Sequence, residues 1–214
     1  MSGNADNETP AVVVIDDDAS VREALRGLFE SVGLPTTTYG SVHAFQAASA
    51  PDGPCCIVLD IRLPGESGLE FQEALAKSGD PRPTVLISAH VDVSMAVRAM
   101  KAGAVDVLTK PVREQDLLEA VNRAIARDRA RRSETEKLRA LRARYATLTE
   151  RERQIMALVA AGKLNKQIAT AVDLTEATVK LHRGQVMRKM EAESVAQLVR
   201  IADALNGTEG ARSS

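Results

Sequence analysis

Two hydrophobic periods alternate along the first half of the chain. Short apolar or β-prone runs predict five strands, most of them covered on both faces. These runs are Val12–Ile15, Thr36–Tyr39, Cys55–Leu59, Thr84–Ile87 and Val105–Leu108. Apolar residues at helical spacing separate them and predict helices at Val21–Val32, Ser41–Ala50, Leu69–Ala76, Ser94–Ala102 and Glu114–Ala126. Five strands alternating with five helices predict an α/β fold with a doubly wound parallel sheet, whose ligands bind at the carboxyl ends of the strands.

The pattern changes after residue 126. Residues 127–146 contain many Arg and no Gly or Pro, with a narrow apolar stripe, which predicts a partly exposed helical linker. Residues 147–207 have only helical periods, and Thr149 with Glu152 fits a capping box. Further helices are predicted at Asn165–Val172, Thr175–Met190 and Ser194–Leu205. Residues 1–10 and 208–214 carry no signal of order, so we expect an α/β domain over 11–126 followed by an all-α domain.

The net charge of −1 conceals a division between the two halves. Residues 1–123 contain 10 Lys and Arg against 18 Asp and Glu, a net of −8. Residues 124–214 contain 18 Lys and Arg against 11 Asp and Glu, a net of +7. A polyanion such as nucleic acid is the natural partner for the basic half, although a solvated charged surface would have the same composition.

Composition also indicates where the protein works. No apolar run is long enough to span a bilayer, and the first ten residues lack the features of a secretory signal. The two cysteines, Cys55 and Cys56, are adjacent and cannot form a useful disulfide. We therefore expect a reduced, cytoplasmic protein that does not associate with membranes.

Carboxylates follow directly on two predicted strands. Asp16 and Asp17 end the first strand, and Asp60 ends the third. Since parallel strands end at the same edge of a sheet, these groups should lie close together. Two such charges 4 Å apart repel each other by about 4 kcal/mol at an effective dielectric constant near 20. A divalent cation would remove that cost, and an all-oxygen ligand set favours Mg²⁺.

Two further strand ends add a hydroxyl and a positive charge. Ser88 ends the fourth strand, and Lys110 follows the fifth. A metal ion, a hydroxyl and an ammonium group around one carboxylate are what an incoming phosphoryl group needs. Asp60 could then act as the nucleophile and become an aspartyl phosphate.

These motifs resemble those of two-component response regulators of the FixJ/NarL type. The receiver domain of that family is matched over residues 11–126 by "VIDDD", "LDIRLPGESG", "LISAH" and "LTKP", in register with the strands. The resemblance implies a flavodoxin-like fold, a phosphoacceptor at Asp60, and oxygen-binding roles for Ser88 and Lys110. It also implies a cis peptide bond between Lys110 and Pro111.

The same resemblance implies the metal ligands. Asp17 and Asp60 would bind Mg²⁺ directly, together with the backbone carbonyl of Arg62, while Asp16 would act mostly through water. One position departs from the family, because most receivers carry Tyr or Phe where this chain has Val107. The ring of that residue usually moves inward on phosphorylation, so the route from the acidic site to the output surface is altered here.

The second half resembles the LuxR-type helix-turn-helix domain, through "LTERERQIMALVAAGKLNKQIATAVDLTEATVKLHRGQVMRKM". In that family Asn165–Val172 would be the scaffold helix and Thr175–Met190 the recognition helix in the major groove. By resemblance, Lys180 and Leu181 would reach base edges. The residues expected to contact DNA are Lys166, Thr178, Lys180, Leu181, His182, Arg183, Arg188 and Lys189. Thr178, Lys166 and Arg183 would hold phosphates and set the register.

Two features of this half leave open questions. Gly184 lies inside the predicted recognition helix, where some relatives have a base-contacting Lys, so their sequence preference does not transfer to this chain. Ser194–Leu205 is a candidate dimer helix, which would read a two-fold symmetric site, but it could also pack only on its own domain.

The sequence favours a transcription regulator in which a sensor histidine kinase phosphorylates Asp60 and thereby controls DNA binding. The phosphorylated protein would form a homodimer or release its DNA-binding domain, and would act with RNA polymerase at promoters. The alternative is a phosphorylation-independent DNA-binding regulator whose receiver is only a dimerisation scaffold. We do not expect an enzyme, because a phosphohydrolase of this type needs a second Asp where Arg62 stands, and "DDDAS" is not a glycine-rich dinucleotide-binding turn.

Overall fold

The computed structural model describes residues 9–48 and 51–210, and the chain divides into two compact units, Met1–Ser133 and Glu134–Ser214. The predictions of disorder for residues 1–8 and 211–214 lie outside the described residues. No helix in the described part of the chain combines the length and the apolar character that a membrane span requires.

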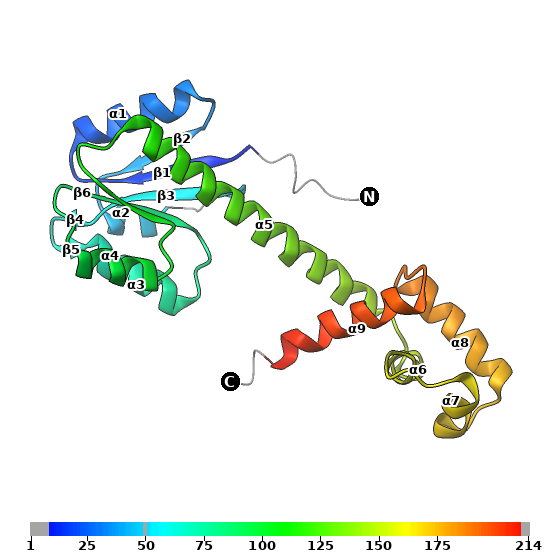
Figure 1. Cartoon of the computed structure of the whole chain (residues 1–214). Coiled ribbons are helices and arrows are strands. Elements are labelled where there is room, and N and C mark those ends of the chain that lie inside the picture. Colours follow the sequence, from blue (N-terminus) through cyan, green and yellow to red (C-terminus); the bar gives the residue numbers. More distant parts are fainter. Residues whose placement is uncertain (1–8, 49–50, 211–214) are drawn as a thin grey trace. The chain divides into compact units, whose positions relative to one another are not determined.

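The first unit is built on a parallel sheet of five strands in the order β2-β1-β3-β6-β7 (Figure 1). The strands are β1 Ala11–Ile15, β2 Thr36–Tyr39, β3 Cys55–Asp60, β6 Thr84–Ser88 and β7 Asp106–Thr109. All five predicted strands are confirmed to within one residue at either end. A short antiparallel hairpin, β4 Arg62–Leu63 with β5 Glu66–Ser67, was not predicted. Its two-residue strands are too short to show a hydrophobic period, and its turn depends on Gly65 at a φ of 81°.

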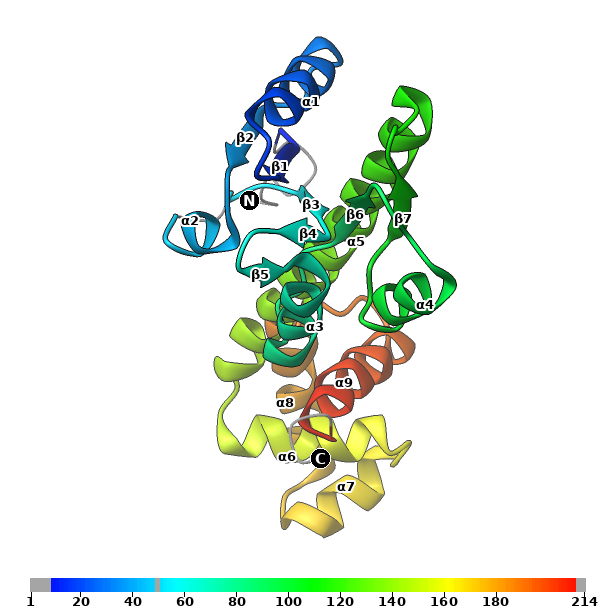
Figure 2. The ribbon, with the colours of Figure 1, turned by 90° about the vertical axis from the view of Figure 1, so that its left-hand side faces the viewer.

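Successive residues of each strand pack into two separate hydrophobic cores. Val12 and Val14 belong to the core that includes Phe29 of α1 and several residues of α5. Val13 and Ile15 belong to the other core, formed with α2, α3 and α4. Figure 2 looks along the strands and shows α1 above their row and α3 and α4 below it. The sheet is therefore buried on both faces, which confirms the doubly wound α/β fold predicted from the continuous apolar runs.

The helices of the first unit are α1 Ala19–Ser31, α2 Val42–Gln46, α3 Gly68–Ser78, α4 Val93–Lys101 and α5 Glu114–Ala146. Helix α2 is shorter than the predicted Ser41–Ala50. Helix α5 is longer than predicted, because it continues through the linker of residues 127–146 without interruption. That segment has no Gly or Pro to stop a helix, so the linker and the last receiver helix are one element.

A buried carboxylate fixes α5 to the sheet. Asp128 is fully buried and accepts a hydrogen bond of 3.0 Å from the backbone N–H of Cys55, at the start of β3. It also forms ion pairs with Arg131 at 2.6 Å and Arg132 at 2.9 Å. The Arg132 guanidinium in turn donates to the backbone carbonyl of Asp52. Sequence reasoning missed this cluster, since Asp128 lies among arginines that all appear solvated.

In the described part of the second unit, the end of α5 is followed by α6 Glu150–Ala160, α7 Asn165–Val172, α8 Glu176–Lys189 and α9 Val195–Gly210. Thr149 and Glu152 form the predicted capping box at the start of α6, and Gly162 follows that helix at a φ of 75°. Thr175 caps α8 as expected. Helix α9 extends beyond its predicted end at Leu205, into residues 208–210 that were expected to be disordered, because no proline interrupts it.

Candidate functional site

The acidic site lies at the carboxyl ends of β1 and β3, which are paired neighbours in the sheet. Asp16 is fully buried, Asp60 is 6% exposed, and Asp17 is open to solvent. Carboxylate oxygens of these three residues lie within 4.8 Å of one another. The structure therefore brings together the three carboxylates that the sequence placed at one edge.

Lys110 reaches this cluster from the end of β7. Its ammonium donates hydrogen bonds of 2.7 Å to Asp16 Oδ2 and 2.5 Å to Asp60 Oδ2. Burial by itself would lower the pKa of Lys110, but the hydrogen bonds and charges of Asp16 and Asp60 outweigh burial and raise that pKa above its ordinary value. Lys110 therefore carries a fixed positive charge between two carboxylates. The Lys110–Pro111 peptide bond is cis, as the family resemblance implied.

Ser88 and Arg62 flank the carboxylate of Asp60. Ser88 is buried at the end of β6, where its hydroxyl donates to the backbone carbonyl of His90 at 3.2 Å. The backbone N–H of Arg62 donates to Asp60 Oδ1 at 2.9 Å, and the Arg62 side chain is exposed. Asp60 Oδ2 is held by Lys110, so both oxygens of this carboxylate are oriented.

Sequence reasoning missed two residues that shape the site. Arg22, one turn into α1, donates to the backbone carbonyls of Asp16 at 2.7 Å and Asp17 at 2.9 Å. A Cβ at Gly68 would lie 2.0 Å from the carbonyl oxygen of Asp60, so only glycine fits there. The motif "LDIRLPGESG" contains this glycine, but its role becomes clear only from the close approach of α3 to the backbone of β3 in the structure.

The donor set suits a hard divalent cation. Asp16, Asp17 and Asp60 offer only carboxylate oxygens, the ligands that Mg²⁺ prefers. Burial raises the pKa of Asp16, despite hydrogen bonds from Lys110 and from the backbone of Asp18 that lower it. A bound cation would offset the cost of keeping this desolvated carboxylate charged.

Helix α8 presents part of the predicted DNA surface to solvent. Lys180, Leu181 and Arg188 are exposed, and Leu181 keeps 62% of its surface despite being apolar. Gly184 lies on the same face, and a Cβ built there meets nothing within 4 Å. Their spacing places them on one side of the helix. Lys166 is exposed on α7.

The remaining predicted DNA contacts are engaged within the unit. Lys189 donates to Glu152 Oε2 at 2.6 Å, and Arg183 hydrogen-bonds the side chain of Asn165. The Thr178 hydroxyl lies 2.8 Å from that of Thr175. Lys189 and Arg183 therefore connect α8 to α6 and α7, and the Thr178 contact is local to the start of α8.

His182 is half-buried in α8. Its Nδ1 is buried without a hydrogen-bond partner among the described residues. The imidazole is therefore turned partly into the unit and is less available to solvent than the exposed side chains of Lys180 and Leu181.

Comparison with known families assigns both halves of the chain. Residues 12–122 match the response regulator receiver domain. Residues 146–202 match the luxR family of bacterial regulatory proteins. The first match covers the five-stranded sheet and its acidic edge, and the second covers the helices α6 to α8 and the first part of α9.

Curated relatives share this arrangement over most of their length. Nodulation protein W of Bradyrhizobium diazoefficiens is 46% identical over 206 residues, which cover 96% of this chain and 91% of the relative. Response regulator protein TodT of Pseudomonas putida is 41% identical over 91% of this chain and 86% of its own. Transcriptional regulatory protein FixJ of Azorhizobium caulinodans is 40% identical over 91% of this chain and 92% of its own.

Solved structures agree with these relatives. The response regulator StyR superposes with a TM-score of 0.83 at 42% identity, over 92% of this chain and 99% of StyR. Full-length FixJ from B. japonicum gives a TM-score of 0.55 at 36% identity, over 92% of this chain and 97% of FixJ.

Proposed function

Because this chain belongs to the response regulators that join a receiver domain to a LuxR-type DNA-binding domain, we propose that phosphorylation of Asp60 controls its binding to DNA. The observation that carries this proposal is the convergence of Asp16, Asp17 and Asp60 within 4.8 Å, with Lys110 bonded to two of them. A receiver that served only as a scaffold would have no use for this costly cluster of like charges.

The proposed chemistry is phosphoryl transfer from a phosphohistidine of a sensor kinase. An oxygen of Asp60 attacks the phosphorus, the bond from phosphorus to the histidine nitrogen breaks, and an acyl phosphate forms. Lys110 and the Ser88 hydroxyl bind the phosphoryl oxygens. Mg²⁺, held by Asp17, Asp60 and the Arg62 carbonyl with Asp16 behind them, would neutralise charge on the phosphoryl group.

The proposed output is sequence-specific binding of double-stranded DNA. Helix α8 enters the major groove, where Lys180 and Leu181 meet base edges. Lys166, Thr178, Arg183 and Arg188 contact phosphates and set the register, with smaller contributions from the half-buried His182 and from Lys189, which is paired with Glu152. Two chains joined through α9 would bind a two-fold symmetric promoter site next to RNA polymerase, in the cytoplasm.

A second candidate function is favoured by one residue. Val107 packs half-buried against the core that includes Leu86, at the position where most receivers carry an aromatic ring. It cannot swing between two positions as a ring does, so the receiver could act as a dimerisation scaffold for DNA binding that is independent of phosphorylation.

Intact-mass measurement tests the chemistry. The full chain is incubated with acetyl phosphate, with and without Mg²⁺, alongside Asp60→Asn. We expect a single phosphoryl adduct that requires Mg²⁺ and is lost in Asp60→Asn. An adduct that survives in Asp60→Asn would place the phosphoacceptor elsewhere, and no adduct under any condition would favour the scaffold function.

A further inference from the structure

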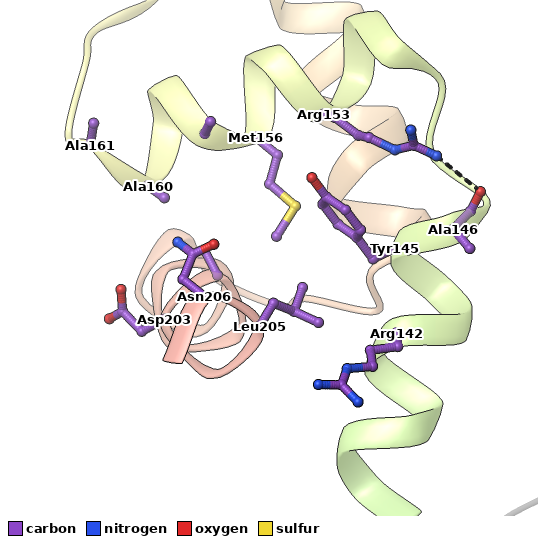
Figure 3. Close-up of a pocket in the computed structure, with 12 residues that line it drawn as sticks. Arg142, Tyr145, Ala146, Arg153, Met156, Ala160, Ala161, Asp203, Leu205 and Asn206 are labelled. Carbon is purple, nitrogen blue, oxygen red and sulfur yellow. Dashed lines mark hydrogen bonds between the residues drawn. The ribbon is translucent and has the colours of Figure 1, made fainter. Parts of the chain in front are cut away.

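A pocket of about 660 Å³ lies within the second unit, far along the chain from the acidic site. Its walls are the last turn of the linker helix α5, the helix α6 and the second half of α9, and Figure 3 shows the side chains that line it. We name it the α5–α6–α9 pocket. Its volume falls within the range of 300–1,000 Å³ that is usual for small-molecule sites.

The pocket is hollow because its walls carry small residues. Five of its twelve lining residues are alanines, Ala146, Ala157, Ala160, Ala161 and Ala202. Met156 and Leu205 supply the larger apolar surface, and Figure 3 shows the Met156 thioether pointing into the space between α6 and α9. An apolar ligand body would bury its surface against these groups, and its removal from water would favour binding.

Two arginines give the pocket its charge. Arg142 has no hydrogen bond or ion pair with the residues that the structure describes, and its guanidinium extends from α5 toward α9 (Figure 3). Arg153 lies beside the Tyr145 ring, with 5.5 Å from its guanidinium carbon to the ring centroid. Asp203 is the one carboxylate that lines the pocket, so the lining carries a net positive charge.

Arg153 forms a wall of the pocket, on the other side of the Tyr145 ring from Arg142 (Figure 3). Its Nε is buried and has no acceptor among the described residues. Its other contacts are long, 3.4 Å to the Ala146 carbonyl and 3.7 Å to Glu150. The Arg153 guanidinium therefore faces the junction of α5 and α6 rather than Arg142.

We propose that the α5–α6–α9 pocket binds a small amphipathic carboxylate, whose apolar body packs on Met156 and the alanines and whose carboxylate pairs with Arg142. A carboxylate gives the Arg142 guanidinium the partner that it lacks among the described residues, whereas a neutral ligand would leave it unpaired. Because the pocket joins α5 to α6 and α9, the ligand would hold the linker helix against the DNA-binding unit. This binding is independent of Asp60 and its phosphorylation.

Calorimetric titration of the full chain tests this proposal with a matched pair of probes, 1-naphthoate and 1-naphthamide. They share an apolar body and differ in charge. We expect the carboxylate to bind at least tenfold more tightly than the amide. Arg142→Gln should lose that preference, while Arg139→Gln, one turn earlier on α5 and outside the pocket, should keep it.

A second variant distinguishes the contribution of charge to ligand binding from the contribution of the free volume of the pocket. Ala157→Leu fills the pocket without changing charge and should abolish binding of both probes, whereas Ala143→Leu, outside the pocket on α5, should leave binding intact. Thermal unfolding confirms that each variant folds. Equal affinity for acid and amide, undetectable binding of 1-naphthoate at millimolar concentration, or full binding by Ala157→Leu would each overturn the proposal. A change of oligomeric state in Ala157→Leu alone would instead assign the pocket to a second copy of the chain.

Discussion

The orientation of the Asp60 side chain is restricted by a backbone hydrogen bond, by an ion pair and by close packing. The Arg62 N–H holds one carboxylate oxygen, and Lys110 holds the other. Behind it, Gly68 lets the first turn of α3 approach the Asp60 carbonyl more closely than any side chain would allow. The side chain therefore has one orientation, which would favour in-line attack in the proposed phosphoryl transfer.

Gly68→Ala should distort this arrangement. The new methyl group would lie 2.0 Å from the Asp60 carbonyl oxygen, so the backbone must move, at a cost of about 1–3 kcal/mol. Urea unfolding of the receiver signal should show this loss, and the phosphoryl adduct should form more slowly. Gly27→Ala is the control, because Gly27 lies in α1 with open space around it and should gain roughly 0.5–1 kcal/mol. Equal stability of Gly68→Ala and wild type would contradict the close approach.

Glu152 makes the second unit sensitive to acid. Burial raises its pKa, but hydrogen bonds from Lys189 and from the backbone of Thr149 outweigh burial and lower that pKa below the ordinary value of 4.5. A lowered pKa in the folded state stabilises the fold above the unfolded-state pKa and loses that contribution as the pH falls through the folded-state pKa.

We therefore expect Glu152→Gln to weaken the second unit at pH 7 and to differ less from wild type as the pH falls below 4.5. Hydrogen exchange of the α6 and α8 amides, compared between the two proteins at each pH, measures that difference. Arg151→Gln is the control, because it also removes one charge next to Glu152, but from a partly exposed side chain that bonds to Gln154. Its difference from wild type should not change with pH in this way. A difference that stays constant with pH would mean that the ionised carboxylate of Glu152 contributes nothing.

At the scale of elements, the spacing of apolar residues predicted the strands of the sheet, and the packing of the structure confirms them. The strands β1, β3 and β6 are continuous apolar runs because both their faces are buried, and such runs are readable from sequence. The proximity of Asp16, Asp17 and Asp60 was predictable because neighbouring parallel strands have their carboxyl ends at the same edge of the sheet. The β4–β5 hairpin was not predictable, because two residues cannot show a period.

Side-chain partners set the other limit of sequence reasoning. Arg183 and Lys189 looked like free cations, yet Asn165 and Glu152 engage them from other helices. Asp128 looked like one charge among many on α5 and proved to be buried against β3. Such pairings depend on how helices dock, which local pattern does not specify.

Removing Asp128 should loosen α5 from the sheet. Asp128→Ala removes the buried carboxylate that pairs with Arg131 and Arg132 and leaves the Cys55 N–H without that acceptor. We expect the free energy of unfolding to fall by about 3–5 kcal/mol. Hydrogen exchange of β3 and α5 should rise accordingly. Glu134→Ala is the matched control, because its i,i+3 pair with Lys137 is exposed and should contribute less than about 1 kcal/mol. Equal exchange in the two variants would contradict a structural role for Asp128.

At the scale of the whole molecule, the charge division of the sequence coincides with the two compact units. The acidic half carries the carboxylate cluster of Asp16, Asp17 and Asp60, and the basic half carries α8. The helix α5 contributes residues to both units, because Glu114–Ala146 runs across the boundary between Ser133 and Glu134.

The most direct test of the account is DNA affinity as a function of phosphorylation. A binding site is selected from random duplexes with the phosphorylated chain, and affinity is measured at fixed salt for phosphorylated protein, unphosphorylated protein and Asp60→Asn. The account predicts that phosphorylation tightens specific binding at least tenfold, with no response in Asp60→Asn and little change on random DNA. Equal specific affinity with and without a confirmed adduct at Asp60 would contradict phosphorylation control and leave the receiver as a scaffold.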